Sequence, residues 1–135
     1  MAKKITEIEG IGPAFQEKLA KANIKTVEDL LEAGASKAGR KKIAEATGID
    51  ESKILGWVNM ADLFRIKGVA SQFAELLEAA GVDTVKELRN RNAENLHAKL
   101  VQVQKEKKIT RVVPSLSKVA DFIDQAKKLD PKVTY

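Results

Sequence analysis

The chain has no cysteine, a single histidine, and aromatic residues at only 4% of its positions. Without cysteine, a disulfide scaffold, a thiolate metal site and a thiol nucleophile are all excluded. The lone His97 cannot supply the pair of imidazoles that a two-histidine metal site or a histidine-based catalytic pair needs. With so few aromatic residues, the core must be built mainly from isoleucine, leucine, valine and alanine, a composition that favours helices.

The sequence also lacks a long apolar run. No segment approaches the length needed to cross a bilayer. The first seven residues carry two lysines but no apolar stretch follows them, unlike a secretory signal. The acidic residues are dispersed over positions that suit helix caps and first turns, and do not form a two-carboxylate site. We therefore expect a cytoplasmic, non-enzymatic protein with no cofactor, no metal ion and no membrane partner.

A repeat organises what the chain does contain. Residues 8–15, Ile-Glu-Gly-Ile-Gly-Pro-Ala-Phe, return fifty-eight positions later as residues 66–73, Ile-Lys-Gly-Val-Ala-Ser-Gln-Phe. A second correspondence, at a shift of sixty-five positions, relates residues 52–64 to residues 117–129. We therefore expect one domain over residues 1–135, made of two pseudo-symmetric units at about 1–64 and 65–135. About seven extra residues fall near 105–113 in the second unit.

Helix caps and stops predict about eight helices and no sheet. The expected helices cover about 13–22, a short segment from Thr26 to Gly34, 37–47, a long segment after Asp50, about 71–80, a short segment after Thr84, a longer segment after Asn92, and 115–129. Asn23 and Gly81 occupy equivalent positions and both tolerate a left-handed conformation, so each marks a helix end. Trp57 corresponds to a phenylalanine in the second unit, which favours a place in the core.

Each unit begins with a tight turn before a helix. The turns are Gly10-Ile11-Gly12 and Gly68-Val69-Ala70. Glycine lets the backbone approach a partner closely, and the amides at the start of the following helix favour a phosphate oxygen. The apolar residue in the middle of each turn is expected to point inward and anchor it. A simpler interpretation is that both turns only reverse the chain.

These turns resemble helix-hairpin-helix motifs. The chain as a whole resembles the tandem helix-hairpin-helix proteins of the bacterial family called domain of unknown function 4332. The residues that carry the resemblance are 8–13, 26–31, 57–59, 66–70, 95–99 and 133–135. The resemblance implies an internally duplicated all-α fold. The wider superfamily implies sequence-independent binding to DNA phosphates, often by paired hairpins across the minor groove, although some of its hairpins only pack against proteins.

The two turns differ in their charged neighbours. Glu9 lies beside the first turn and Pro13 removes one amide donor, so that turn is well shaped but repels phosphate. The second turn has basic and polar neighbours: Arg65, Lys67, Ser71 and Gln72. The second turn departs from the motif at Ala70, which adds a methyl group where close approach is needed. We expect the second turn to be the stronger phosphate contact.

The leading hypothesis is a non-enzymatic protein that binds duplex DNA of any sequence, because the turn is duplicated and the net charge is +5. The basic cluster Arg40-Lys41-Lys42, with Lys37 just before it, either adds phosphate contacts or is a solvated helix face opposite a buried side of Ile43 and Ala46. The predicted DNA contacts are Gly10, Ile11, Gly12, Arg40, Lys41, Arg65, Lys67, Gly68, Val69, Ala70, Ser71 and Gln72. The alternative is a helical protein–protein interaction or assembly module without nucleic-acid binding, which Glu9, Pro13 and the modest net charge favour.

Overall fold

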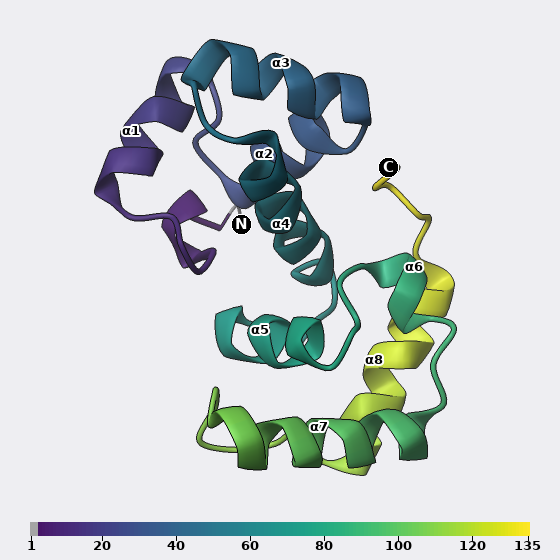
Figure 1. Ribbon diagram of the computed structural model, residues 1–135. Coiled ribbons are helices and arrows are strands. Elements are labelled where there is room, and N and C mark those ends of the chain that lie inside the picture. The colour runs from purple at the N-terminus through teal and green to yellow at the C-terminus, as the bar shows by residue number, and fades with distance from the viewer. Residues whose placement is uncertain (1–2) are drawn as a thin grey trace. The chain divides into compact units, whose positions relative to one another are not determined.

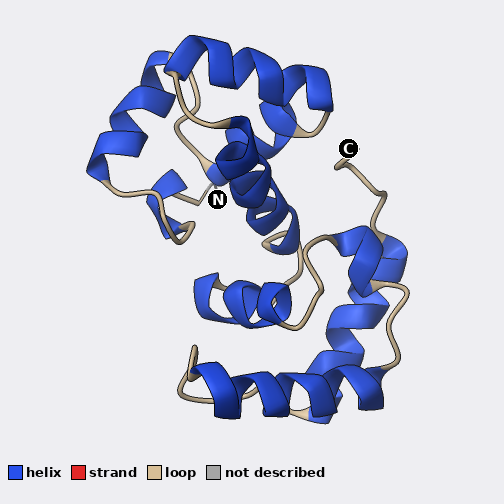
Figure 2. Ribbon diagram, viewed as in Figure 1, coloured by secondary structure: helices blue, strands red, loops and turns tan. Residues whose placement is uncertain are grey.

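The computed structural model describes residues 3–135, and this part of the chain is helical without a strand or sheet (Figures 1 and 2). Its elements are a short 3-10 helix η1 (Ile5–Glu7) and the α-helices α1 (Pro13–Lys21), α2 (Val27–Gly34), α3 (Lys37–Thr47), α4 (Glu51–Leu63), α5 (Ser71–Ala79), α6 (Val85–Leu88), α7 (Ala93–Lys107) and α8 (Leu116–Lys128). One isolated antiparallel bridge joins Lys4 to Thr26. The predicted all-α class with eight helices is confirmed.

The chain divides into two compact units. Unit 1 comprises Met1–Asp62 and Lys132–Tyr135, and unit 2 comprises Leu63–Pro131. The division after Asp62 lies close to the position expected from the repeat. The last four residues differ from that expectation, because they belong to unit 1 although they follow the final helix of unit 2.

Side-chain caps explain where several helices begin. Thr26 Oγ1 accepts a hydrogen bond from the backbone N–H of Asp29 at 3.0 Å, and Asp29 Oδ2 accepts one from Thr26 N at 3.2 Å. This reciprocal capping box starts α2. Asp29 Oδ2 also accepts from Lys25 N at 3.1 Å. That bond, followed by hydrogen bonding to the carboxyl from the side chain and the backbone N–H of Thr26, holds the pKa of the Asp29 carboxyl below its usual value.

Gly34 is the last residue of α2 and is buried. A Cβ added there would lie 2.6 Å from Cγ2 of Val58 on α4, closer than atoms can approach without displacement. The sequence indicated Gly34 only as a helix stop. The structure shows that its lack of a side chain also lets α2 and α4 pack closely.

The extra segment of unit 2 folds back on the end of α7. Helix α7 is followed by its C-cap residue Lys108, which adopts a left-handed conformation with φ of 49°. Two residues on, the buried Thr110 donates its N–H to Oε1 of Gln104 at 2.9 Å. The Gln104 amide also donates to the carbonyl of Thr110. One side-chain amide of α7 therefore pairs with both polar groups of a single backbone residue and fixes this segment.

Candidate nucleic-acid interface

The two glycine turns have the same backbone geometry. Gly10 and Gly68 both have φ of +95°, a left-handed value that favours glycine. Each turn is closed by a backbone hydrogen bond, from Ile11 N to the carbonyl of Ile8 at 3.1 Å and from Val69 N to the carbonyl of Ile66 at 3.2 Å. Ile11 and Val69 are buried, as predicted, so these two side chains support the turns from inside rather than facing a partner.

Each turn packs against an aromatic side chain of its own unit. A Cβ on Gly10 would lie 3.3 Å from Nε1 of Trp57, and one on Gly68 would lie 3.1 Å from Cε1 of Phe122. The positive φ favours glycine at both positions, and a Cβ there would also be a tight contact for the aromatic ring. Trp57 is 5% exposed, which confirms its predicted place in the core. Trp57 and Phe122, which the repeat predicts to be equivalent, therefore occupy matching positions against the two turns.

The helices that follow the turns begin without a side-chain cap. Gly12 and Ala70 occupy the N-cap positions of α1 and α5, with φ and ψ of −94° and −171° at Gly12 and −103° and −177° at Ala70. These are extended values that alanine adopts without strain. Six other helices have a side-chain cap, provided by Thr26, Ser36, Asp50, Thr84, Asn92 and Ser115. Unlike those helices, α1 and α5 have no side-chain acceptor for the backbone N–H groups of their first turn.

The second turn is held by residues of unit 2 that surround it. Lys67 is exposed, but its backbone N–H donates to Oε1 of Gln125 at 2.8 Å, and its carbonyl accepts from Nε2 of Gln125 at 3.1 Å. Arg65 is half-buried and donates from Nη2 to the carbonyl of Asp130 at 2.8 Å. The sequence did not indicate Gln125. Its repeat counterpart is Met60, so the repeat carries no signal for this contact.

The remaining predicted polar contacts of this turn lie at the start of α5. Gln72 is exposed and Ser71 is half-buried, and both lie in the first turn of α5, where backbone N–H groups have no intrahelical acceptor. Gly68 and Ala70 are also exposed. The structure therefore brings these residues together with Lys67 on the surface of unit 2.

Arg40 does not lie on a solvated helix face, so its predicted role as a surface phosphate contact is wrong. It is 3% exposed, and its Nη1 donates to the carbonyls of Gly34 at 2.9 Å and Ala35 at 3.0 Å. Nη2 donates to the carbonyl of Thr134 at 2.6 Å. The guanidinium is buried because its fork of donors matches three carbonyl groups, two of them at the C-terminal end of α2.

The buried position of Arg40 shows which side of α3 faces the core. Ile43 is buried as expected, whereas Ala46 is exposed, so the buried side of the helix is formed by Arg40 and Ile43. Lys41 is exposed, as expected for either interpretation of the basic cluster. Of the two basic residues singled out on α3, only Lys41 is available to a partner.

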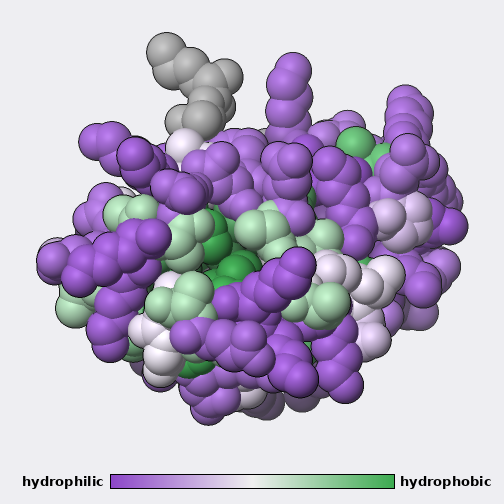
Figure 3. Space-filling model, turned by 90° about the horizontal axis from the view of Figure 1, so that it is seen from above, coloured by the Kyte–Doolittle hydropathy of each residue, from purple (hydrophilic) through white to green (hydrophobic). Residues whose placement is uncertain are grey.

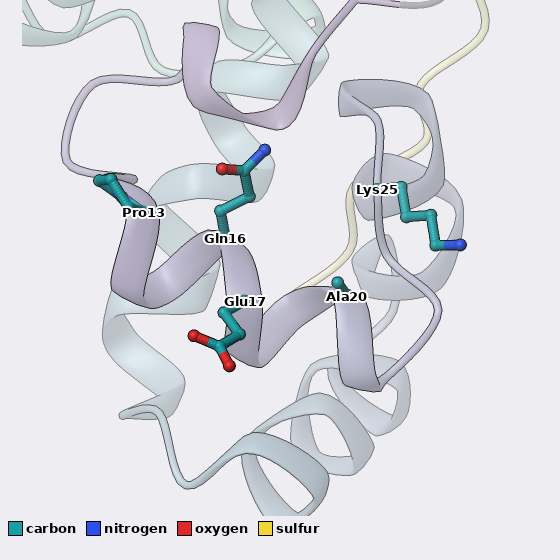
Figure 4. Close-up of a pocket in the computed structure, with 5 residues that line it drawn as sticks. All are labelled: Pro13, Gln16, Glu17, Ala20 and Lys25. Atoms are coloured by element: carbon teal, nitrogen blue, oxygen red, sulfur yellow. The ribbon is translucent and has the colours of Figure 1, made fainter.

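A hollow of about 400 Å³ lies along the exposed side of α1, lined by Pro13, Gln16, Glu17, Ala20 and Lys25 (Figure 4). Glu17 and Lys25 point away from each other, so the hollow has no converging pair of charged groups. The face of the molecule in Figure 3 is mainly hydrophilic, with smaller hydrophobic areas between the hydrophilic residues. In residues 3–135 no three or more histidine or acidic side chains lie together in a group suited to a metal ion.

These features define an all-helical protein of two compact units, each with a glycine turn that leads into a helix without a side-chain cap. The chain belongs to the family described as domain of unknown function (DUF4332), whose model matches residues 9–129. No curated protein and no solved structure matches it. Within the described residues, every helix is too short or too polar to traverse a lipid bilayer.

Proposed function

We propose that this protein is a non-enzymatic, cytoplasmic, sequence-independent DNA-binding protein that uses its two turns as tandem helix-hairpin-helix elements. The observation that carries the proposal is that the helices differ in whether a side chain caps their N-terminus. Six α-helices begin with a side-chain cap, whereas α1 and α5, which follow the exposed glycine turns, do not. Amides at a helix start that lack an internal acceptor can receive one from a phosphate group.

The second turn is the better phosphate site of the two. The start of α5 retains the N–H groups of Ser71 and Gln72, and the exposed Lys67 adds positive charge beside them. At the first turn, Pro13 has no N–H and Glu9 is exposed. A carboxylate near the phosphate would be repulsive, whereas a lysine would release a counterion and strengthen binding at low salt.

Binding to a short duplex DNA, measured by fluorescence anisotropy over a series of salt concentrations, tests this function. We expect the logarithm of the affinity to fall linearly with that of the salt concentration, with a slope of about −0.9 for each neutralised phosphate, and to be the same for unrelated sequences. Arg65→Glu with Lys67→Glu should weaken binding by about tenfold or more, because two cations beside the second turn become anions.

Lys127→Glu with Lys128→Glu is the matched control, since these exposed residues at the end of α8 make the same change in net charge. The control variant should bind more tightly than the variant of the second turn. The proposal is overturned by undetectable binding at low salt, or by equal weakening in the two variants.

A helical assembly module is the second candidate, and exposed apolar residues of unit 2 favour it. Val112 is 68% exposed and Leu116 is 43% exposed, with the buried Pro114 between them. Large apolar side chains that remain exposed are suited to contact with a protein partner. Crosslinking after nuclease treatment distinguishes the two functions, because an assembly module retains a specific protein partner when nucleic acid is removed.

A further inference from the structure

Two lysines of unit 1 hold their ammonium groups over the same aromatic ring. Lys18 Nζ lies 5.8 Å and Lys53 Nζ lies 5.7 Å from the centroid of the Phe15 ring. Lys18 follows Phe15 on α1, whereas Lys53 comes from the first turn of α4. Both distances lie within the range in which a ring attracts a cation. Two helices thus bring two positive charges to one small patch, which we call the Phe15 patch.

The ring at the centre of this patch is fixed by the core. Phe15 is half-buried and meets Trp57 edge-on, with ring centroids 5.0 Å apart and an angle of 64° between the planes. Trp57 also contacts the first turn, at the position where Gly10 leaves room for it. Phe15 itself is the third residue of α1, directly after that turn. The Phe15 patch and the first turn therefore form one packed arrangement within unit 1.

The positive charge of the patch has no acidic partner. Neither Lys18 nor Lys53 forms an ion pair with a carboxylate in the described part of the chain, and both side chains are exposed. Both ammonium groups are exposed beside the same ring, so each can attract an anion from solution. The ring restricts the lysine chains, so less conformational freedom is lost when an anion binds.

Unit 2 does not repeat the patch. At the repeat position of Lys18 it has Leu76, which is buried, although Phe73 and Lys118 occupy the positions of Phe15 and Lys53. Unit 2 has basic residues beside its turn instead, whereas the first turn has Glu9 and Pro13. The two units therefore place their positive charge at different points relative to their turns.

We propose that Lys18 and Lys53 bind backbone phosphates of DNA, so that in unit 1 the Phe15 patch adds to the weaker contact made by the first turn. This inference rests on the proposed DNA binding of the protein. Duplex DNA carries a phosphate charge for about every 1.7 Å of its axis, dense enough to occupy both ammonium groups at once. Lys18 and Lys53 become the main phosphate contacts of unit 1, and Phe15 is a positioning residue for them.

The test is the salt dependence of duplex DNA binding by the double variant Lys18→Gln, Lys53→Gln. If each lysine neutralises one phosphate, the magnitude of the slope should fall by about 1.8 and the affinity at low salt by at least about tenfold. The matched control is Lys127→Gln with Lys128→Gln, which removes the same charge from exposed positions of α8 and should leave the slope close to that of the wild type. Lys18→Arg with Lys53→Arg should keep both the charge and the binding.

Phe15→Leu separates the ring from the charges. It keeps both lysines and an apolar contact with Trp57 but removes the ring that holds the ammonium groups. We expect about a threefold loss of affinity with little change in slope, because the charges remain but are less well placed. An unchanged affinity would show that the ring does not position the lysines.

Trp57 gives an independent readout, because it is the only tryptophan and contacts the Phe15 ring. DNA should alter its emission in the wild type and, at saturating DNA, in the Arg65→Glu, Lys67→Glu variant, but not in Lys18→Gln, Lys53→Gln. If the wild type binds DNA and the Lys18 and Lys53 variant matches its control in slope, the Phe15 patch is excluded while the proposed function stands. If the wild type binds no DNA, both proposals fail.

Discussion

Asp29 illustrates how a single residue fixes a helix start and makes stability depend on pH. Its carboxylate accepts backbone hydrogen bonds from Lys25 and Thr26. These bonds favour the charged form, so the pKa of Asp29 is lowered in the folded protein, the bond from Lys25 being the largest contribution. A lowered pKa means that the folded state releases this proton more readily than the unfolded chain does.

Asp29→Asn should therefore reduce the free energy of unfolding at neutral pH by about 0.5–1 kcal/mol, because asparagine accepts the same bonds without a charge. The contribution of the charge is complete above the ordinary pKa of an aspartate, near 3.8, and is lost as the pH falls through the lower folded value. Urea unfolding of both proteins at several pH values checks this. A difference that stays constant down to strongly acidic pH would contradict it.

At the scale of helices, the packing of α2 on α4 depends on the missing side chain of Gly34. Gly34→Ala would improve helix propensity, but the new methyl group would meet Val58. Because overpacking a close contact costs about 1–3 kcal/mol, we expect a net loss of stability. Adding Val58→Ala to Gly34→Ala should recover part of the loss, since the smaller side chain makes room. Thermal unfolding of the single and double variants measures this, and a stabilised single variant would exclude the close contact.

The helices also show which parts of the fold could be predicted from the sequence. The caps at Thr26, Ser36 and Asn92 involve partners three residues away, so local sequence was sufficient to place the helices they begin. Arg40 and Gln125 bind backbone groups 94 and 58 positions away, and no local pattern indicates such partners. The turns were predictable because their glycines recur. The Phe15 patch was not, because Lys53 on α4 comes near the Phe15 ring of α1 only in the folded protein.

For the whole molecule, Arg40 is the residue that ties the last part of the chain to unit 1. Its guanidinium binds the carbonyl of Thr134, and Thr134 N donates to the carbonyl of Ala35 at 2.8 Å. Arg40→Met would leave three carbonyl groups without this donor. We expect the free energy of unfolding to fall by about 2–4 kcal/mol.

Hydrogen exchange gives a local measure of the same effect. The amide of Thr134 should exchange faster in Arg40→Met than in the wild type, because the segment that carries it loses its strongest attachment. Arg40→Lys is the matched comparison, since it keeps the charge but loses the fork of donors and should fall between the two. Unchanged exchange at Thr134 together with unchanged stability would remove Arg40 from this role.

The position of residues 132–135 also has a consequence for synthesis on the ribosome. All of unit 2 lies between two parts of unit 1 in the sequence, and the buried Val133 belongs to the later part. Chains usually complete their N-terminal units first as they emerge. Here unit 2 has all of its residues available before unit 1 receives the last of its core. The unit that begins the chain is therefore the last to be completed.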